Sequence, residues 1–543
     1  MGREANNHSI RALEKQIEEG KGDIIQLKRT RNSLLNISTL VPPEILGDVF
    51  AWSLVREAGS SLGFESDFDG LQRGSYSFLL VCHHWFEVAF RTPELWSFWG
   101  NTLQNWKNQH HRSGDAPLDL VLDGSRCDPD VSFNESLRGA VRGHVMQDAI
   151  RQVHLTSDKG ATLTPIISSL TPDDGARNEN IESIVWRNRG HPSVDVSDFF
   201  AQSCLLKLRQ LKLHGDFIIS WDRLASQTTR LTTLLLKITD FPSASPITTS
   251  QLFSILASNP NLQKLSLSDL ALPIDTDGST PPVPLRDLEA LFLTGNFRHV
   301  FGLLRQLILP DMLDHLYLTG LDSAVEDLLQ ILGPYMRDRF RRDPRFQDKL
   351  EITFFSTPDC ISVSVDAMWP HATAMERDPP FAVFVMEFNH VPPPDVLEQL
   401  FIGLTKFLPH EYAVSFSADL HVKPPEELFS MMPNVETLDL SGLELSKGFL
   451  QPNPDGPRAN TKLIPSLRSL CLHDITLDGD DWSHLTTYLA HQTSDGRAIL
   501  LEIGGCCPHM CPEMVEEVEA LVEDFDCYPG PATACPFGRC KGG

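Results

Sequence analysis

The sequence predicts an α/β protein in which a small all-helical segment is followed by a long repeating strand-and-helix body. A leucine-rich spacing recurs along most of the chain, and two short apolar runs near the N-terminus have helical spacing. A heptad-like pattern precedes both runs. At 543 residues the chain is longer than one compact domain, so several domains or one elongated repeat array are expected.

Residues 1–38 are expected to form an amphipathic helix. Six apolar residues fall on the a and d positions of a heptad: Ile10, Leu13, Ile17, Ile24, Leu27 and Leu34. Gly20 and Arg31 occupy the other two core positions and weaken such a seam. We therefore favour a single helix, with weak self-association through a coiled coil as the alternative.

Residues 39–100 are predicted to form a small helical module with an inserted polar loop at 56–77. Pro42 and Pro43 suit the first turn of a helix, and Glu44 is well placed against the helix dipole. Apolar residues follow at helical spacing up to Leu54, which predicts a helix from Pro42 to Leu54. A second run predicts a helix from Phe78 to Phe90, ended by a proline.

This module resembles the F-box, in the form common in the large F-box protein sets of mushroom-forming fungi (basidiomycetes). The residues that carry the resemblance are Leu40, Pro42, Pro43, Glu44, Ile45, Leu46, Val49, Phe50, Leu80, Val81, Cys82, Trp85, Pro93, Leu95 and Trp96. The resemblance implies that the first twelve of these bind a Skp-type adaptor and, through it, a cullin. The chain would then be a non-catalytic substrate receptor of a ubiquitin ligase, whose catalysis resides in the recruited conjugating enzyme.

After a connector at 101–117, the body at 118–512 repeats the spacing apolar, two others, apolar, one other, apolar. Copies begin at Ile150, Ile181, Leu208, Leu231, Leu262, Leu288, Leu313, Val435 and Leu467. The first seven starts are roughly 23 to 31 residues apart, close to the period of about 20 to 29 of leucine-rich repeats. The spacing predicts an irregular leucine-rich-repeat solenoid, with a curved parallel sheet inside and helices outside.

Several further elements are expected within this body. LFSILASN and VEDLLQILG are predicted helices, the second closing before Pro334. Buried strands are predicted at LEITFF, FAVFVMEF and YAVSF, with residues 118–122 as the first strand and 500–503 as the last. An ordinary α/β domain with leucine-rich strands is the alternative to a solenoid.

Side chains between the leucines of each strand should face the concave side of such a sheet. They include Lys212, Lys264, Glu289, His315 and Glu436. In the leucine-rich-repeat class of F-box proteins, which this pattern resembles, that side holds the protein destined for ubiquitin transfer. A repeat scaffold or regulatory binding protein acting outside a ubiquitin ligase is the alternative function.

Composition limits the partners and the location that are expected. The net charge is −26, from 46 basic and 72 acidic residues, which argues against nucleic acid and anionic membrane surfaces. No secretory signal or membrane-spanning run is recognisable. The 11 cysteines, an odd number at irregular spacing, suit a reducing compartment, so we expect an intracellular protein of the cytoplasm or nucleus.

The sequence contains no recognisable catalytic or cofactor-binding signature. Phosphate-binding glycine loops and the nucleophile elbow are missing, and His410-Glu411 lacks the second histidine of a zinc protease. An enzyme whose site is built from dispersed residues is the third alternative. At 513–543 we expect a capping helix and a cysteine-rich tail. Cys507 and Cys511, just before this segment, and Cys535 and Cys540 within it are alternative zinc ligands, at spacings unlike standard zinc sites.

Overall fold

The computed structural model describes 18 continuous segments of the chain and three single residues. The segments are 41–55, 81–99, 112–114 with 116–123, 150–171, 179–237, 247–268, 281–321, 325–347 with 349–356, 360–367, 382–388, 410–419, 433–441, 464–473, 479–494 with 496–504, and 512–528; the single residues are 15, 20 and 403. The predicted N-terminal helix, apart from residues 15 and 20, and the loop at 56–77 lie outside these segments. The chain divides into two compact units, Met1–Ser245 and Pro246–Gly543.

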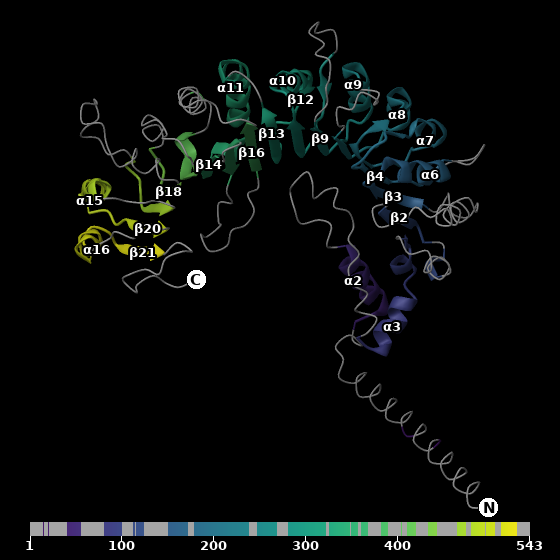
Figure 1. Ribbon diagram of the computed structural model, residues 1–543, viewed down its shortest axis with the longest axis horizontal. Coiled ribbons are helices and arrows are strands. Elements are labelled where there is room, and N and C mark those ends of the chain that lie inside the picture. The colour runs from purple at the N-terminus through teal and green to yellow at the C-terminus, as the bar shows by residue number, and fades with distance from the viewer. Residues whose placement is uncertain are drawn as a thin grey trace, which may run out of the picture. The chain divides into compact units, whose positions relative to one another are not determined.

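The first unit contains three short helical elements and then a parallel sheet (Figure 1). Its helices are α2 (Pro43–Val55), α3 (His83–Phe90), η4 (Pro93–Trp96), α6 (Gly160–Leu170), α7 (Ser197–Gln202) and α8 (Trp221–Gln227). Its main strands are β1 (Phe98–Trp99), β2 (Leu118–Asp123), β3 (Ile150–Ser157), β4 (Ser183–Asn188), β6 (Gln210–Gly215) and β8 (Thr233–Lys237). They pair in parallel in that order, and β5 (Val194–Asp195) pairs with β7 (Phe217–Ile218) beside them.

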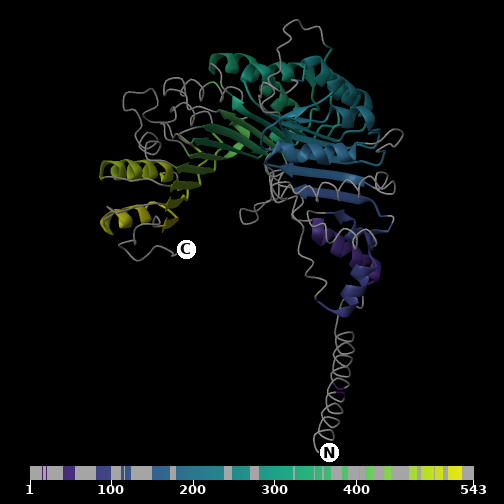
Figure 2. The same cartoon turned by 45° about the vertical axis from the view of Figure 1, so that its right-hand side comes forward.

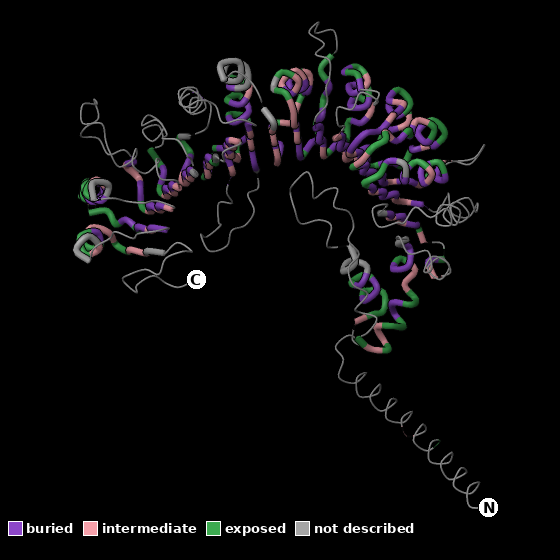
Figure 3. The backbone as a smooth tube through the Cα atoms, viewed as in Figure 1, coloured by how far each residue is buried: buried purple, intermediate pink, exposed green. Residues whose placement is uncertain are grey.

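The leucine-rich spacing produces this sheet because its apolar residues come into register on neighbouring strands. One buried row consists of Leu120, Val153, Ile184, Leu211 and Leu234, and the next of Leu122, Leu155, Trp186, Leu213 and Leu236. Helices α6, α7 and α8 lie along one side of these strands in both views (Figures 1 and 2). Buried residues alternate with more exposed ones along β6, whereas every residue of β4 is buried (Figure 3).

A close backbone contact fixes the ends of two of these strands. Gly215 has a φ of +110°, and a Cβ at this position would lie 1.8 Å from the carbonyl oxygen of Asn188. The buried Asn188 side chain donates to the carbonyl oxygen of Asp216 at 3.1 Å. Only glycine allows β6 to end this close to β4.

The second unit contains a longer sheet that is mostly parallel. Its strands are β9 (Lys264–Ser268), β11 (Ala290–Thr294), β13 (His315–Leu321), β16 (Ala382–Phe388), β15 (Ile361–Ala367), β14 (Leu350–Ser356), β17 (Ala413–Asp419), β18 (Thr437–Ser441), β19 (Ser469–His473), β20 (Leu500–Gly504) and β21 (Asp524–Tyr528), given in the order in which they pair. Strand β15 is antiparallel to both of its neighbours. The uniformly parallel sheet predicted for this region is therefore wrong at β14–β16.

Helices and short segments flank this second sheet. They are α9 (Thr249–Ser258), α10 (Phe297–Gln306), α11 (Val325–Arg342), η5 (Pro344–Gln347), η6 (His410–Tyr412), α15 (Gly479–Thr493) and α16 (Pro512–Glu519), and a separate strand pair joins β10 (Val283–Pro284) to β12 (Leu307–Ile308). The predicted helix at LFSILASN is confirmed as α9. The predicted stop before Pro334 is wrong, because α11 continues through Pro334 to Arg342.

The α/β class is confirmed, and each copy of the leucine-rich spacing named above contains a strand. The predicted strands at 118–122 and 500–503 are confirmed as β2 and β20, but their predicted positions as the first and last strands are wrong. The short β1 pairs with β2 ahead of the predicted first strand, and β21 pairs with β20 after the predicted last strand. Among the described residues, no helix is both long enough and apolar enough to span a membrane.

Candidate functional site

The helical module of the first unit has a closed apolar core. Its buried members are Leu46, Phe50, Val88, Ala89, Leu95 and Trp96. The ring of Phe50 lies 5.0 Å from that of the half-buried Trp85. The indole Nε1 of Trp96 donates to the carbonyl oxygen of Ala89 at 2.9 Å, which ties η4 to α3. The three elements therefore form one packed body.

Helix α2 and η4 approach closely because residue 47 has no side chain. A Cβ at Gly47 would lie 2.8 Å from Thr92 Oγ1. That hydroxyl donates to the carbonyl oxygen of Val88 at 2.8 Å, so it is held in place. Gly47 thus sets the distance between the two halves of the module.

The second helix begins later than predicted. Cys82 has extended backbone dihedrals, and its Sγ accepts a hydrogen bond from the backbone N–H of Trp85. It is therefore the N-cap of a helix that starts at His83, and the predicted start at Phe78 is wrong. His83 lies on the exposed side and faces Glu87 one turn later, with Nδ1 3.5 Å from Oε1.

Two pairs of large apolar side chains on this module are exposed although its core is filled. Ile45 and Val49 are each 53% exposed and lie one turn apart on α2; Phe86 and Phe90 are 44% and 43% exposed and lie one turn apart on α3. The two phenylalanine rings stack at 5.6 Å. Arg112 lies over the rings of Phe90 and Trp96, at 4.4 and 4.6 Å from their centroids. These pairs are suited to contact another molecule.

The structure therefore divides the predicted adaptor-binding residues into two groups. Leu46 and Phe50 belong to the core and present almost no surface. Pro42, Pro43, Glu44, Ile45, Val49 and Val81 are exposed, and Cys82 and Trp85 are half-buried. Leu40 and Leu80 lie outside the described residues. Phe86 and Phe90 were missed, because they lie away from the apolar stripe that Trp85, Val88 and Ala89 make on α3.

The sheet of the first unit carries a group of basic side chains on the face opposite its leucine rows. In one register row Arg187, His214 and Lys237 follow one another on β4, β6 and β8. In the adjacent row His154, Val185, Lys212 and Leu235 follow one another on β3, β4, β6 and β8. We call His154, Arg187, Lys212, His214 and Lys237 the basic strip.

The basic strip surrounds a small apolar contact and contains two histidines whose pKa values are lowered. Val185 and Leu235 are buried together on either side of Lys212. Burial, followed by the charges of Lys212 and Arg187, lowers the pKa of His154 to about 4. Burial, followed by the charges of Arg187, Lys237 and Arg189, lowers the pKa of His214 to about 4. Both imidazoles are therefore neutral near pH 7, where they can donate one hydrogen bond each.

The corresponding face of the second unit is aromatic at one place and acidic at another. Phe292 and Tyr317 lie side by side in register, their rings stacked at 4.7 Å, and Lys264 lies 5.3 Å from the centre of the Phe292 ring. Further along, Glu351 and Asp366 face each other across β14 and β15. Burial, and then the charge of Glu351, raises the pKa of Asp366 to about 6.

Of the five residues predicted for the concave face, three lie within strands on this side of the sheets. Lys212, Lys264 and His315 are half-buried strand residues. Glu289 and Glu436 are exposed and lie one residue ahead of β11 and β18. Their backbone N–H groups donate to Gln263 and Val414 of the neighbouring segments. Because they precede the strands, strand alternation does not assign them to a face, and their placement on the concave side stays a prediction.

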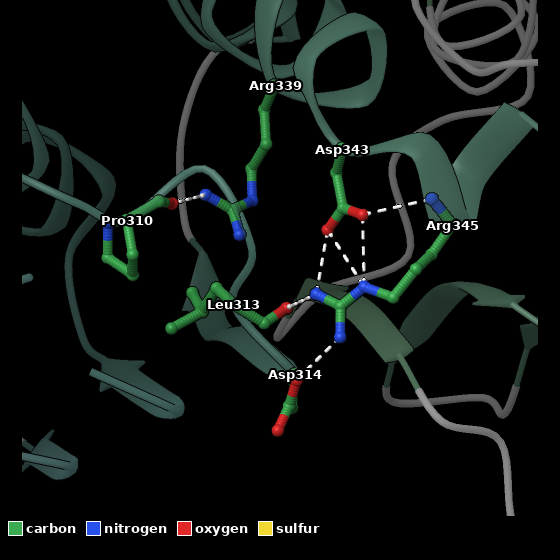
Figure 4. Close-up of polar contacts among 6 residues, drawn as sticks. All are labelled: Pro310, Leu313, Asp314, Arg339, Asp343 and Arg345. Atoms are coloured by element: carbon green, nitrogen blue, oxygen red, sulfur yellow. Dashed lines mark hydrogen bonds and ion pairs between the residues drawn. The ribbon is translucent and has the colours of Figure 1, made fainter. Parts of the chain in front are cut away.

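A buried polar network joins the end of α11 to the start of β13 (Figure 4). Arg345 donates through Nε and Nη2 to Asp343, through Nη1 to Asp314 at 2.5 Å, and through Nη2 to the carbonyl oxygen of Leu313 at 3.0 Å. Burial alone would lower the pKa of Arg345, but the hydrogen bonds to Asp343 and Asp314 outweigh it and raise that pKa. Arg339 donates to the carbonyl oxygen of Pro310 at 3.2 Å. Asp343 and Asp314 offset the charge of Arg345, whereas Nη2 of the buried Arg339 has no hydrogen-bond partner among the described residues.

The cysteines predicted as alternative zinc ligands, Cys507, Cys511, Cys535 and Cys540, lie outside the described residues. Within the described segments, no three His, Cys, Asp or Glu side chains come together in a way that could hold a metal ion.

Comparison with known proteins adds no family to these observations. No family model matches the sequence. No curated protein matches it either.

Proposed function

We propose that this chain is a non-catalytic substrate receptor of a cullin-based ubiquitin ligase. The α2–α3 module would bind a Skp-type adaptor, and the strand-and-helix body would hold a protein target. The observation that carries the proposal is the pair of exposed apolar patches, Ile45 with Val49 and Phe86 with Phe90, on a module whose core is already filled. Clustered exposed apolar groups of this kind are typical of interaction surfaces.

The position of these patches supports the adaptor interpretation. They lie within residues 40–96, the segment whose sequence resembles the F-box. Ile45 and Val49 are two of the residues through which the resemblance implies adaptor contact, and their exposure leaves them available for it. Leu46 and Phe50 would act indirectly, by holding the two helices together.

The decisive experiment is co-purification of the full chain with a basidiomycete Skp-type adaptor. The double variant Ile45→Glu/Val49→Glu should weaken the complex at least about tenfold, because two charges would enter an apolar contact. Both side chains are half exposed, so the variant should remain folded. Far-ultraviolet circular dichroism and the thermal midpoint would verify the fold, and size-exclusion chromatography would measure the complex.

Ile308→Glu is the matched control. Ile308 is 55% exposed and lies in β12 of the second unit, so its substitution should leave adaptor binding within about twofold of the wild type. The proposal fails if the wild-type chain forms no stoichiometric complex, or if the Ile45/Val49 variant binds as tightly as Ile308→Glu. The first outcome would favour a scaffold that acts outside a ubiquitin ligase.

A further inference from the structure

The sheet of the second unit carries partly exposed side chains on the face opposite its core. Tyr317 of β13 is in register with Val385 of β16, and Val385 with Ser364 of β15. All three are half-buried, whereas the adjacent strand residues Leu318 and Met386 are 1% exposed. Because side chains alternate between the two faces along a strand, the three half-buried residues share the face away from the core.

The Tyr317 ring stands upright on this face. It stacks on Phe292 of β11, with ring centres 4.7 Å apart and ring planes 10° from parallel. This distance matches the spacing of neighbouring strands, about 4.8 Å, so the flat sides of both rings are turned toward the neighbouring strands. Lys264, on the far side, lies over Phe292. The other flat side of Tyr317 is turned toward β16, where the shorter Val385 is its neighbour in register.

Apolar exposure on this face continues at β14. Phe355 is 42% exposed. It lies in one register row with Glu387 of β16 and Ser362 of β15. Exposed aromatic side chains beside a filled core are typical of interaction surfaces.

Two carboxylates lie on either side of the position of Val385 along the strands. Asp366 is in register with Val383, and Glu387 lies four residues after Val383 on β16. Both carboxylate side chains are half-buried and keep part of their surface exposed. Within the described segments, no Lys, Arg or His side chain forms an ion pair with either of them. Their charges are therefore not offset by the chain itself.

The electrostatics around Asp366 favour a cationic partner. Burial, and then the charge of Glu351, raises the pKa of Asp366, and the hydrogen bond from Ser364 offsets this only in part. The charge of Asp366 also contributes to the raised pKa of Tyr317, so the carboxylate lies near the ring. A carboxylate in such surroundings gains stability from a positive charge placed beside it.

The register indicates the shape of that partner. Four residues of strand separate the positions of the two carboxylates, which is about 13 Å at about 3.3 Å per residue. An extended peptide has the same rise and points its residues i, i+2 and i+4 to one side. Cationic side chains at i and i+4 would reach Asp366 and Glu387, and the side chain at i+2 would lie over Val385.

We call Tyr317, Ser364, Asp366, Val385 and Glu387 the aromatic–acidic surface. We propose that it binds an extended basic segment of a protein, in which Arg or Lys at positions i and i+4 flanks an apolar residue at i+2. The apolar side chain would rest on Val385 beside the Tyr317 ring. The inference deepens the proposed function by naming the class of target that the body holds, and it rests on that proposal only for this role.

The test is fluorescence anisotropy with the full chain and three labelled peptides. The spaced peptide has Arg at i and i+4, Leu at i+2 and Ser elsewhere; the clustered peptide has the same residues with both Arg side by side; the neutral peptide has Gln for Arg. We expect the spaced peptide to bind, the clustered one about fivefold more weakly and the neutral one at least about tenfold more weakly. Equal binding of the spaced and clustered peptides would overturn the proposal, because general attraction to an acidic chain would then explain it. So would no binding of the spaced peptide.

Variants locate the binding on the aromatic–acidic surface. Asp366→Asn/Glu387→Gln keeps the size of both side chains and should reduce the affinity for the spaced peptide by about tenfold, and Glu387→Gln alone by about threefold. Asp287→Asn/Glu517→Gln is the control, because it removes the same charge from two exposed positions of the same unit, outside this surface. Equal losses in the control and the Asp366/Glu387 variant would contradict the assignment.

The adaptor assay separates the two proposals. The Asp366/Glu387 variant should still co-purify with the adaptor, because it leaves the helical module unchanged. A wild-type chain that binds the adaptor but not the spaced peptide would refute the basic-segment proposal alone. Peptide binding by a chain that binds no adaptor would refute the ubiquitin-ligase role alone.

Discussion

Asp343 is a carboxylate with no exposed side-chain surface, placed directly after α11. Its charge is balanced by Arg345, which donates to it through Nε at 3.0 Å and through Nη2 at 2.7 Å. Arg345→Ala would leave this carboxylate buried without its cation, and such a loss costs about 3 to 5 kcal/mol. We expect a correspondingly lower urea midpoint for the transition that contains the second unit.

Arg342→Ala provides the comparison, because it removes an ion pair at the surface of the neighbouring α11. Arg342 Nη2 lies 2.7 Å from Asp338 Oδ2, and both side chains are about 60% exposed. Exposed pairs contribute about 0 to 1 kcal/mol, so this variant should unfold close to the wild-type midpoint. Equal midpoints for the two variants would show that the buried pair does not hold α11 to β13.

Between elements, the packing of α2 on η4 depends on the missing side chain of Gly47. Alanine usually stabilises a helix relative to glycine by about 1 kcal/mol. Here Gly47→Ala should destabilise the module, because the new Cβ would lie 2.8 Å from Thr92 Oγ1. In a Thr92→Ala background the nearest remaining atom of residue 92 is its Cβ, at 3.6 Å. There Gly47→Ala should become neutral or stabilising.

Hydrogen exchange of the α2 amides in the full chain measures this double-mutant cycle. The expected pattern is faster exchange in Gly47→Ala than in the wild type, with exchange in the double variant no faster than in Thr92→Ala. Gly47→Ala that slows exchange in both backgrounds would show that α2 and η4 have room to move apart.

The strands were predictable because their evidence is local. The spacing of Leu211 and Leu213 recurs in each copy of the leucine-rich pattern and is enough to bury one side of a strand. A parallel neighbouring strand with the same spacing continues the buried row of leucines. Strand β15 was not predicted, although ISVSVDA alternates regularly. Its pairing with β14 and β16 reverses direction within a parallel sheet, and no local spacing specifies strand direction.

Tertiary packing explains the missed helix end. Pro334 should interrupt α11, since it removes a hydrogen bond and crowds the preceding turn. Beyond it, however, Met336 and Phe340 are each 3% exposed, and the Phe340 ring contacts Phe346 and Phe384 at 5.0 and 5.5 Å. Burial of these side chains offsets the proline, and the sequence of one helix does not reveal it.

The candidate sites were predictable only in part for a related reason. Helical spacing placed Ile45 and Leu46 in one apolar group, but only the packing against α3 and η4 decides that Leu46 is inside and Ile45 outside. Lys212 could be identified within one repeat. The sequence alone did not place Arg187 beside His214, because Arg187 follows the apolar spacing that defines the strand. Only the register of β4 and β6 shows this pairing.

For the whole molecule, the two units contain buried titratable groups whose effects on stability have opposite pH dependence. In the first unit, the folded pKa of His154, about 4, lies below its ordinary value of 6.5. Folding therefore favours the neutral imidazole, whose contribution is complete above pH 6.5 and is lost as the pH falls through 4. It amounts to at most about 3 kcal/mol. Arg187 and Lys212 are the cations that face it.

In the second unit, the folded pKa of Asp366, about 6, lies above its ordinary value of 3.8. Folding therefore favours the protonated carboxyl, whose contribution is complete below pH 3.8 and is lost as the pH rises through 6. Asp366→Asn should stabilise the second unit near pH 7.5 by up to about 3 kcal/mol, and this gain should shrink near pH 5.5. His154→Gln should show the reverse trend, improving relative to the wild type as the pH falls.

Urea unfolding of the wild type and both variants at these two pH values measures the trends. Because the residues lie in different units, each substitution should move only the transition of its own unit, in opposite directions with pH. If the stabilities of both variants relative to the wild type changed in the same direction with pH, burial would not explain the shifted pKa values of His154 and Asp366. A single transition moved by both variants would instead show that the two units unfold together, with the opposite signs preserved.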